Sequence, residues 1–120
     1  MDELKYHLSV TLFFQEKCFG LGPMILLQGV EKTGSLQQSA VSMGMAYSKA
    51  WKIIRQLEKD WGFPLLYRHT GGTNGGGSIL TPKAKILLDT YQKMSEDIDN
   101  YAEKSFKQYF DKDFYDKIKE

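Results

Sequence analysis

The chain has 120 residues, a formal net charge of +1 and one cysteine. This length is enough for one hydrophobic core and too short for two comfortable domains, so we expect a single domain over residues 1–120. The lone Cys18 excludes an internal disulfide and fits a reducing cytoplasm. No stretch approaches the roughly 20 apolar residues of a membrane span, and the N-terminus has no secretion signal. We therefore expect a cytoplasmic protein without a membrane partner.

Catalytic and metal-binding groups do not gather in the sequence. Cys18, His7 and His69 have no metal-ligand spacing, and no pair of nucleophile and base is apparent. We therefore expect neither a cofactor nor enzymatic activity.

The N-terminal segment alternates as a strand does. Apolar side chains in residues 6–14 occupy every second position, at Tyr6, Leu8, Val10, Leu12 and Phe14. This pattern predicts a strand with one buried side. It leaves the pairing partner open between a hairpin later in the chain and the same strand of a second subunit. Residues 20–23 end the strand and start a helix that is predicted over about 23–32.

Residues 35–61 predict two helices around a tight turn. Ser35 followed by Gln38 is a capping-box pattern, and it opens a helix of about two turns. Gly44 supplies the positive φ that ends this helix. The second helix is predicted over about 46–61.

The second helix has one apolar face and one basic face when its residues are placed at about 100° per step. The core face consists of Ala46, Ala50, Ile53, Ile54, Leu57 and Trp61. The opposite face consists of Ser48, Lys52, Arg55 and Lys59, flanked by Tyr47, Lys49 and Trp51. On an isolated helix such a basic row is simply a solvated surface. As the second helix of a helix-turn-helix, it is suited to reach guanine acceptors in the major groove or phosphates.

A hairpin is predicted next. Residues 65–70 and 78–80 have strand character, and the run GGTNGGG between them contains the turn signal Asn74-Gly75. A nucleotide-binding loop does not fit, because no lysine follows the glycines and no strand-to-helix setting surrounds them. A structureless connector stays open as an alternative. As a wing tip, the glycines would let backbone N–H groups approach phosphates closely.

Two helices followed by a hairpin are typical of a winged helix-turn-helix that binds double-stranded DNA. The local charge agrees, because residues 36–85 hold seven cations and two acids, a net of +5, which leaves −4 for the rest of the chain. Arg68 and His69 lie at the base of the wing, which is predicted over about 65–80. The predicted DNA-binding residues are Tyr47, Ser48, Lys49, Lys52, Arg55, Lys59, Arg68, His69, Thr70, Gly71, Gly72, Thr73, Asn74 and Gly75.

The longest predicted helix covers about residues 82–110, with Thr81 as its cap and Pro82 at its first position. Its apolar positions alternate steps of three and four, at Ala84, Leu87, Tyr91, Met94, Ile98 and Tyr101. An intramolecular core helix stays an alternative, but about 28 residues make a helix of about 42 Å, which exceeds so small a module. We therefore expect a homodimer whose interface residues are Leu87, Tyr91, Met94, Ile98 and Tyr101. We expect the charged tail, residues 111–120, to fray.

Two motifs resemble those of a known family. The pattern LE-x-x-x-G-x-PL-x-x-R is present as Leu57, Glu58, Gly62, Pro64, Leu65 and Arg68. The wing pattern R-x-TGG-x-x-GGG-x-x-LT is present as Arg68, Thr70, Gly71, Gly72, Gly75, Gly76, Gly77, Leu80 and Thr81. Over roughly residues 8–110 the chain resembles the N-terminal DNA-binding domain of the ModE family of molybdate-responsive transcription regulators, a relative of the LysR-type winged helix.

The resemblance implies a mainly α fold with a small β component. In detail, it implies a winged helix-turn-helix with an N-terminal strand and a long C-terminal dimerisation helix. It also implies a transcription regulator that reads duplex DNA as a dimer. Family members that sense molybdate carry a C-terminal oxyanion-binding region, and nothing comparable is present before Glu120. The resemblance therefore does not extend molybdate binding to this chain, and no effector ligand is evident in its sequence.

Two departures from the family pattern support an alternative function. Ala46 replaces the usual serine cap of the second helix, at a cost of about 1 kcal/mol. Thr73 and Asn74 replace a basic residue that is often found in the wing tip. The alternative is a winged-helix module for protein–protein contact without specific DNA binding.

Overall fold

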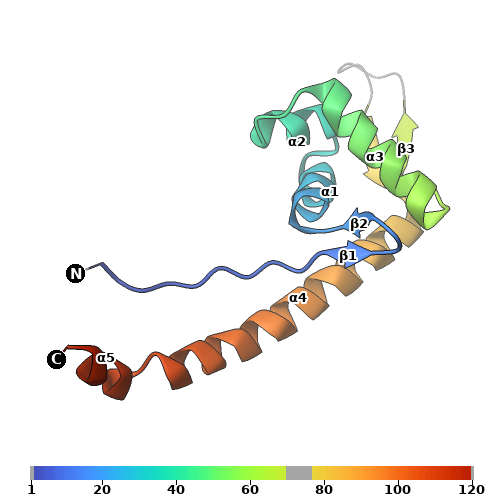
Figure 1. Cartoon of the computed structure of the whole chain (residues 1–120). Helices are drawn as coiled ribbons and strands as arrows, with labels where there is room; N and C mark the ends of the chain where they lie inside the picture. The colour runs from blue at the N-terminus through green and yellow to red at the C-terminus, as the bar shows by residue number, and fades with distance from the viewer. Residues whose placement is uncertain (1, 70–76, 120) are drawn as a thin grey trace.

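The computed structural model describes residues 2–69 and 77–119. Its elements in chain order are β1 (Leu12–Phe13), β2 (Lys17–Phe19), α1 (Leu21–Thr33), α2 (Leu36–Ser42), α3 (Tyr47–Trp61), β3 (Leu66–His69), β4 (Gly77–Leu80), α4 (Pro82–Tyr109) and α5 (Lys112–Ile118). The mainly α fold, with the small antiparallel sheets β1–β2 and β3–β4, confirms the predicted fold class. Figure 1 shows α1, α2, α3 and the β3–β4 hairpin as a head, from which α4 extends as an arm. No helix within the described ranges is long and apolar enough to cross a membrane.

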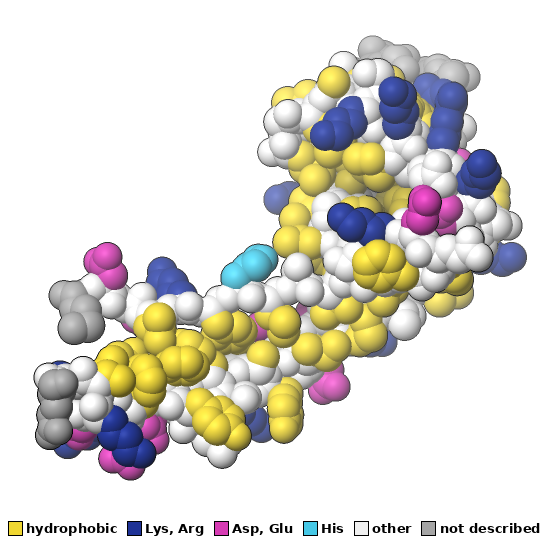
Figure 2. Space-filling view, in the orientation of Figure 1, with side chains coloured by type: hydrophobic (Ala, Val, Ile, Leu, Met, Phe, Trp, Pro, Cys, Tyr) yellow, Lys and Arg dark blue, Asp and Glu magenta, His cyan; other side chains and the backbone are white. Residues whose placement is uncertain are grey.

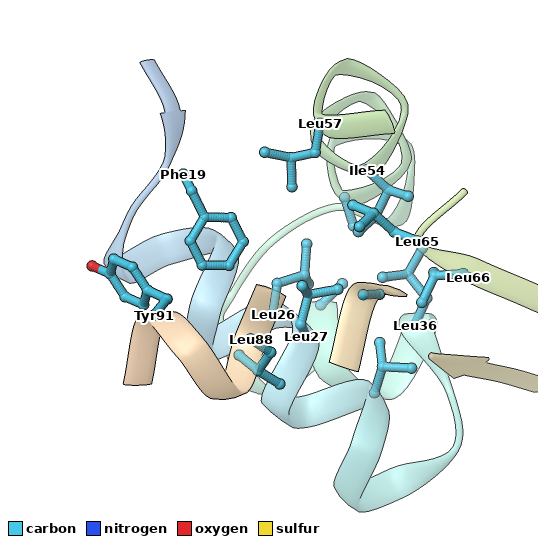
Figure 3. Close-up of a cluster of buried hydrophobic side chains, with 14 residues drawn as sticks. Phe19, Leu26, Leu27, Leu36, Ile54, Leu57, Leu65, Leu66, Leu88 and Tyr91 are labelled. Carbon is cyan, nitrogen blue, oxygen red and sulfur yellow. The ribbon is translucent and has the colours of Figure 1, made fainter. Parts of the chain in front are cut away.

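The hydrophobic core lies inside the head and is closed by the first turns of α4. Leu26, Leu27, Ile54, Leu65 and Leu88 are fully buried. They come from three helices and from the residue before β3, and their side chains converge in Figure 3. The apolar positions of α3 and of the start of α4 therefore serve one common core.

A close approach of α1 and α2 depends on one glycine. A Cβ placed on Gly29 would lie 2.0 Å from the hydroxyl oxygen of Ser39. That hydroxyl donates to the backbone carbonyl of Leu26 at 2.7 Å, so it is buried with a partner. The absence of a side chain at Gly29 thus allows the hydrogen bond that joins the two helices.

The structure confirms the predicted helix ends. The Ser35 hydroxyl accepts the N–H of Gln38 at 3.1 Å and begins α2. Gly44 follows α2 with a φ of +66°, which is the left-handed conformation expected there. The Thr81 hydroxyl accepts the N–H of Ala84 at 3.1 Å and begins α4. These local capping rules position the helix pair and the arm.

The strand predicted over residues 6–14 is largely wrong. Only Leu12–Phe13 forms a strand, and it pairs with β2, the next strand in the chain. The two expected partners were a later hairpin and the same strand of a second subunit. Residues 2–11 have no regular secondary structure and run beside α4 (Figure 1). A helix has no free row of backbone groups to offer a strand, so side chains hold this segment instead.

The N-terminal segment is tied to one face of the arm. The Tyr6 hydroxyl donates to the carboxylate of Asp99 at 3.0 Å, and its ring centroid lies 5.1 Å from that of Phe106. Further along, the Tyr91 hydroxyl donates to the backbone carbonyl of Val10. The apolar residues that alternate along the N-terminal segment therefore mark the side of the segment that packs on α4.

The arm is a 28-residue helix, as the sequence predicted. The tail beyond it, expected to fray, forms α5 instead, because the Asp111 carboxylate accepts the N–H of Phe114 at 3.0 Å. Phe114 also packs edge-on against Phe110, with 4.8 Å between ring centroids. The radius of gyration is 19.0 Å and the longest dimension 67 Å, whereas a compact chain of this length has a radius of about 14 Å. Much of α4 therefore lies outside the head.

Candidate nucleic-acid interface

α3 buries the face that the sequence predicted, apart from its first residue. The buried or partly buried residues are Ala50, Ile53, Ile54, Leu57 and Trp61. Ala46, which was expected on this face, is exposed because it precedes the helix in an extended conformation. Its methyl group has no oxygen to cap α3, in keeping with the missing serine.

The opposite side of α3 faces solvent. The six exposed residues predicted there are Tyr47, Ser48, Lys49, Lys52, Arg55 and Lys59. The two acids of the helix are engaged elsewhere: the Glu58 carboxylate accepts the N–H of Leu65 at 2.7 Å, and that of Asp60 accepts the amide of Gln56 at 2.9 Å. The exposed row is therefore cationic.

This basic row belongs to a larger positive surface. Figure 2 shows several Lys and Arg side chains on the part of the head where α3 and the wing strands lie. Such a surface can bind phosphates through charge alone. Across residues 2–69 and 77–119, no three His, Cys, Asp or Glu side chains are placed to hold a metal ion.

The wing is a two-stranded antiparallel hairpin in the described part of the chain. In its register Leu66 pairs with Leu80, and Arg68 pairs with Ser78. Arg68 and His69 are exposed on β3, as expected of residues at the base of a wing. The remaining predicted wing residues lie outside the described residues; these are Thr70, Gly71, Gly72, Thr73, Asn74 and Gly75.

Two hydrogen bonds that are donated by backbone N–H groups hold the wing against the helices of the head. The N–H of Ser78 donates to the carbonyl of Gly34, in the turn between α1 and α2, at 2.9 Å. At the other strand, the Glu58 carboxylate of α3 accepts the N–H of Leu65. The spacing from Glu58 to Leu65 in the motif thus has a structural role, because this hydrogen bond fixes the start of the wing relative to α3.

One contact between the wing and α3 was not predicted. The guanidinium carbon of Arg68 lies 4.6 Å from the ring centroid of Trp51, and that of Arg55 lies 5.8 Å from the same ring. The Arg68 guanidinium also lies 3.5 Å from the hydroxyl of Tyr47. From the sequence, Trp51 was expected only to flank the basic row. Its spacing of four residues from both Tyr47 and Arg55 was a signal for the contacts within α3, but not for the contact with Arg68.

The predicted dimerisation residues divide into three groups along the arm. Tyr91 is a correction: it is only 3% exposed, and its ring packs on Phe19 with 4.9 Å between centroids, so it belongs to the core of its own chain. Leu87 and Met94 are partly buried and line an apolar groove of about 400 Å³ between the head and the arm. Ile98 and Tyr101 are 37% and 76% exposed.

Comparison with known proteins identifies the family of the head. Residues 23–85 match the family described as bacterial regulatory helix-turn-helix protein, lysR family. The transcriptional regulator ModE of Haemophilus influenzae is 41% identical over 66 residues, which are 55% of this chain and 26% of that protein. The DNA-binding transcriptional dual regulator ModE of Escherichia coli K12 is 31% identical over 94 residues, which are 78% of this chain and 36% of that protein. The chain thus spans about a quarter to a third of these relatives.

A solved structure supports the same fold. The crystal structure of the CbnR_DBD–DNA complex matches with a TM-score of 0.55 at 20% sequence identity. The match covers 68% of this chain and 88% of that chain. The winged helix-turn-helix arrangement is therefore shared, with little identity in sequence.

Proposed function

The chain belongs to the LysR family of bacterial regulatory helix-turn-helix proteins, and from this membership we propose that it regulates transcription by binding double-stranded DNA as a homodimer. The observation that carries the proposal is the exposed cationic row of α3, opposite a face that is buried in the core. The role is one of binding and not of catalysis. Binding to chromosomal DNA places the action of the protein in the cytoplasm, and no effector ligand is part of the proposal.

In this proposal α3 is the recognition helix and enters the major groove. Lys52 and Arg55 project from its exposed side, with Ser48 one turn earlier. Arg or Lys side chains there reach guanine O6 and N7 or pair with phosphates. The wing contacts the neighbouring backbone through Arg68 and His69 at its base, so it contributes affinity more than sequence choice.

The homodimer is proposed from the arm. Ile98 and Tyr101 are apolar or aromatic residues exposed on a helix that extends beyond the head. A second copy packed along this part of α4 would remove their apolar surface from water. A twofold pair of heads would place two recognition helices about one DNA turn apart, or a multiple of that, and would select a roughly palindromic site.

A binding assay with duplex DNA at two salt concentrations tests the proposal. DNA binding through lysines and arginines releases counterions, so affinity is expected to fall steeply as salt rises. Selection of bound sequences from a random duplex pool then provides the operator. No binding to the selected or the random pool at low salt would contradict the proposal and favour a winged-helix module for protein–protein contact.

A further inference from the structure

The sequence contains two arginines, Arg55 and Arg68, and both guanidinium groups lie over one indole ring. The ring belongs to Trp51, which is partly buried on α3. Arg55 comes from the next turn of the same helix, whereas Arg68 comes from β3 of the wing. The same chain has 14 lysines, so its arginines are concentrated at this one place.

Tyr47, one turn before Trp51 on α3, contacts both Trp51 and Arg68. The two rings meet edge to face, with 6.2 Å between centroids and an interplanar angle of 80°. The Tyr47 hydroxyl lies 3.5 Å from the Arg68 guanidinium. Tyr47, Trp51 and Arg55 follow each other at intervals of four residues, so they form one row along α3 that meets Arg68 of the wing.

We propose that Trp51 is a positioning residue, whose indole holds the Arg68 guanidinium against α3 so that the wing base and the recognition helix present one surface to DNA. The inference rests on the proposed DNA-binding function and adds to it a residue that need not touch DNA. An arginine that already has a defined direction loses less conformational freedom on binding than one that moves freely in solvent.

Arginine suits this role better than lysine. Its guanidinium is planar, stacks on aromatic faces and still presents several N–H donors toward a phosphate or base. A lysine at position 68 would keep the charge but would not stack as a flat group. Arg68→Lys therefore distinguishes the effect of stacking on Trp51 from the effect of the positive charge alone.

The first experiment uses the free protein and needs no DNA. In a sample labelled with ¹³C at arginine, the two residues give two sets of Cδ–Hδ signals, which Arg68→Lys assigns. The Arg68 signals are expected at high field because of the Trp51 ring current, to lose that shift in Trp51→Leu and to keep most of it in Trp51→Phe. Tyr67→Leu, an exposed neighbour on β3, is the control and should leave the signals in place. Random-coil shifts for Arg68 in the unmodified protein would overturn the proposal.

The second experiment measures affinity for the selected duplex. Trp51→Leu is expected to weaken binding about threefold to tenfold, and Trp51→Phe by less, because aromatic contact with each arginine has a modest strength. In an Arg68→Ala background the loss from Trp51→Leu should shrink, since the two residues act together. Thermal unfolding of each variant checks that the fold is retained.

The outcomes separate the two ideas. If Trp51→Leu lowers the affinity equally with and without Arg68, or raises it, the positioning role of Trp51 is overturned. The proposed function would still stand. If neither the unmodified protein nor any variant binds DNA at low salt, the proposed function fails. The chemical shifts of the Arg68 Cδ–Hδ groups still show whether Trp51 holds Arg68.

Discussion

The backbone N–H of Ser78 donates a hydrogen bond of 2.9 Å to the carbonyl oxygen of Gly34. This bond joins β4 of the wing to the turn between α1 and α2. Next to it, Gly77 has no side chain, and a Cβ there would lie 2.7 Å from the same carbonyl oxygen. The position of the wing relative to the helix pair therefore depends on a direct contact between two backbones.

Gly77→Ala should destabilise the protein by about 1–3 kcal/mol, because the new methyl group would force the wing away from Gly34. Chemical denaturation measures the change in the free energy of unfolding. Gly22→Ala is the matched control, since Gly22 lies in the first turn of α1 with nothing within 4 Å of an added Cβ. Equal stability of the two variants would contradict this account of the wing.

Gly29→Ala should also destabilise the protein, by about 2 kcal/mol or more, because its Cβ would overlap the Ser39 hydroxyl. Combining it with Ser39→Ala should recover only part of the loss. The two Cβ atoms would still lie 2.7 Å apart, and the hydrogen bond to Leu26 would be gone. Full recovery in the double variant, measured by denaturation, would show that α1 and α2 separate more easily than expected.

Lys52→Ala and Arg55→Ala should each weaken binding to the selected duplex by about 1–3 kcal/mol if the side chain reads a base edge. Both residues lie opposite the buried face of α3, so the free energy of unfolding should change little. Lys104→Ala removes the same charge from the exposed side of the arm and serves as the control. Fluorescence anisotropy with labelled duplex is the measurement. Unchanged affinity in both α3 variants would rule out this face as the reading surface.

Charge placed on the outer part of the arm should separate the proposed dimer. Ile98→Glu combined with Tyr101→Glu would put like charges between two copies of α4, and the variant should be a monomer that binds a half-site weakly. Lys107→Glu changes the charge about 180° from Ile98 and about 120° from Tyr101 around the helix, and it should leave the dimer intact. Light scattering at micromolar concentration gives the mass. A mass near 13.8 kDa for the unmodified protein would defeat the dimer proposal.

The contact of Tyr6 with the arm should depend on pH. Desolvation beside α4, followed by the hydrogen bond to Asp99 and its negative charge, raises the pKa of the Tyr6 phenol above its usual value of 10.0. The neutral phenol is the form that packs, so its stabilising effect is complete below pH 10 and is lost as the pH rises through the higher pKa.

A difference titration between the unmodified protein and Tyr6→Phe, followed by tyrosinate absorbance, isolates this phenol. Its midpoint should lie above 10.0, and Asp99→Asn should move it back down. A midpoint at or below 10.0 would show that the N-terminal segment does not rest on α4 in solution.

Local rules of the sequence predicted much of the head. Ser35, Gly44 and Thr81 end or begin helices as their side chains or backbone preferences require. The helical period correctly separated the exposed Lys52 and Arg55 from the buried Ile54. Once the apolar side of a helix is buried, the opposite side is the one exposed to solvent.

The errors share a physical cause, which is that periodicity shows which residues share a face but not what covers it. The Tyr91 side chain was assigned to a second subunit, and the N-terminal segment of the same chain covers it instead. The contact of Arg68 with Trp51 joins residues on different elements, so no local pattern contains it.

The root of the arm is fixed firmly to the wing. The hydroxyl of Thr81 donates to the carbonyl of Pro64 at 2.7 Å, and its N–H donates to that of Leu65 at 2.9 Å. From there α4 runs about 42 Å to its far end. Because Leu88 and Tyr91 are buried in the head, only the part of α4 after Met94, about 22 Å long, lies beyond it, and a bend of about 5° there displaces the far end by about 2 Å. In a homodimer joined along the arms, the spacing of the two recognition helices would be set at the end of the molecule farthest from the DNA.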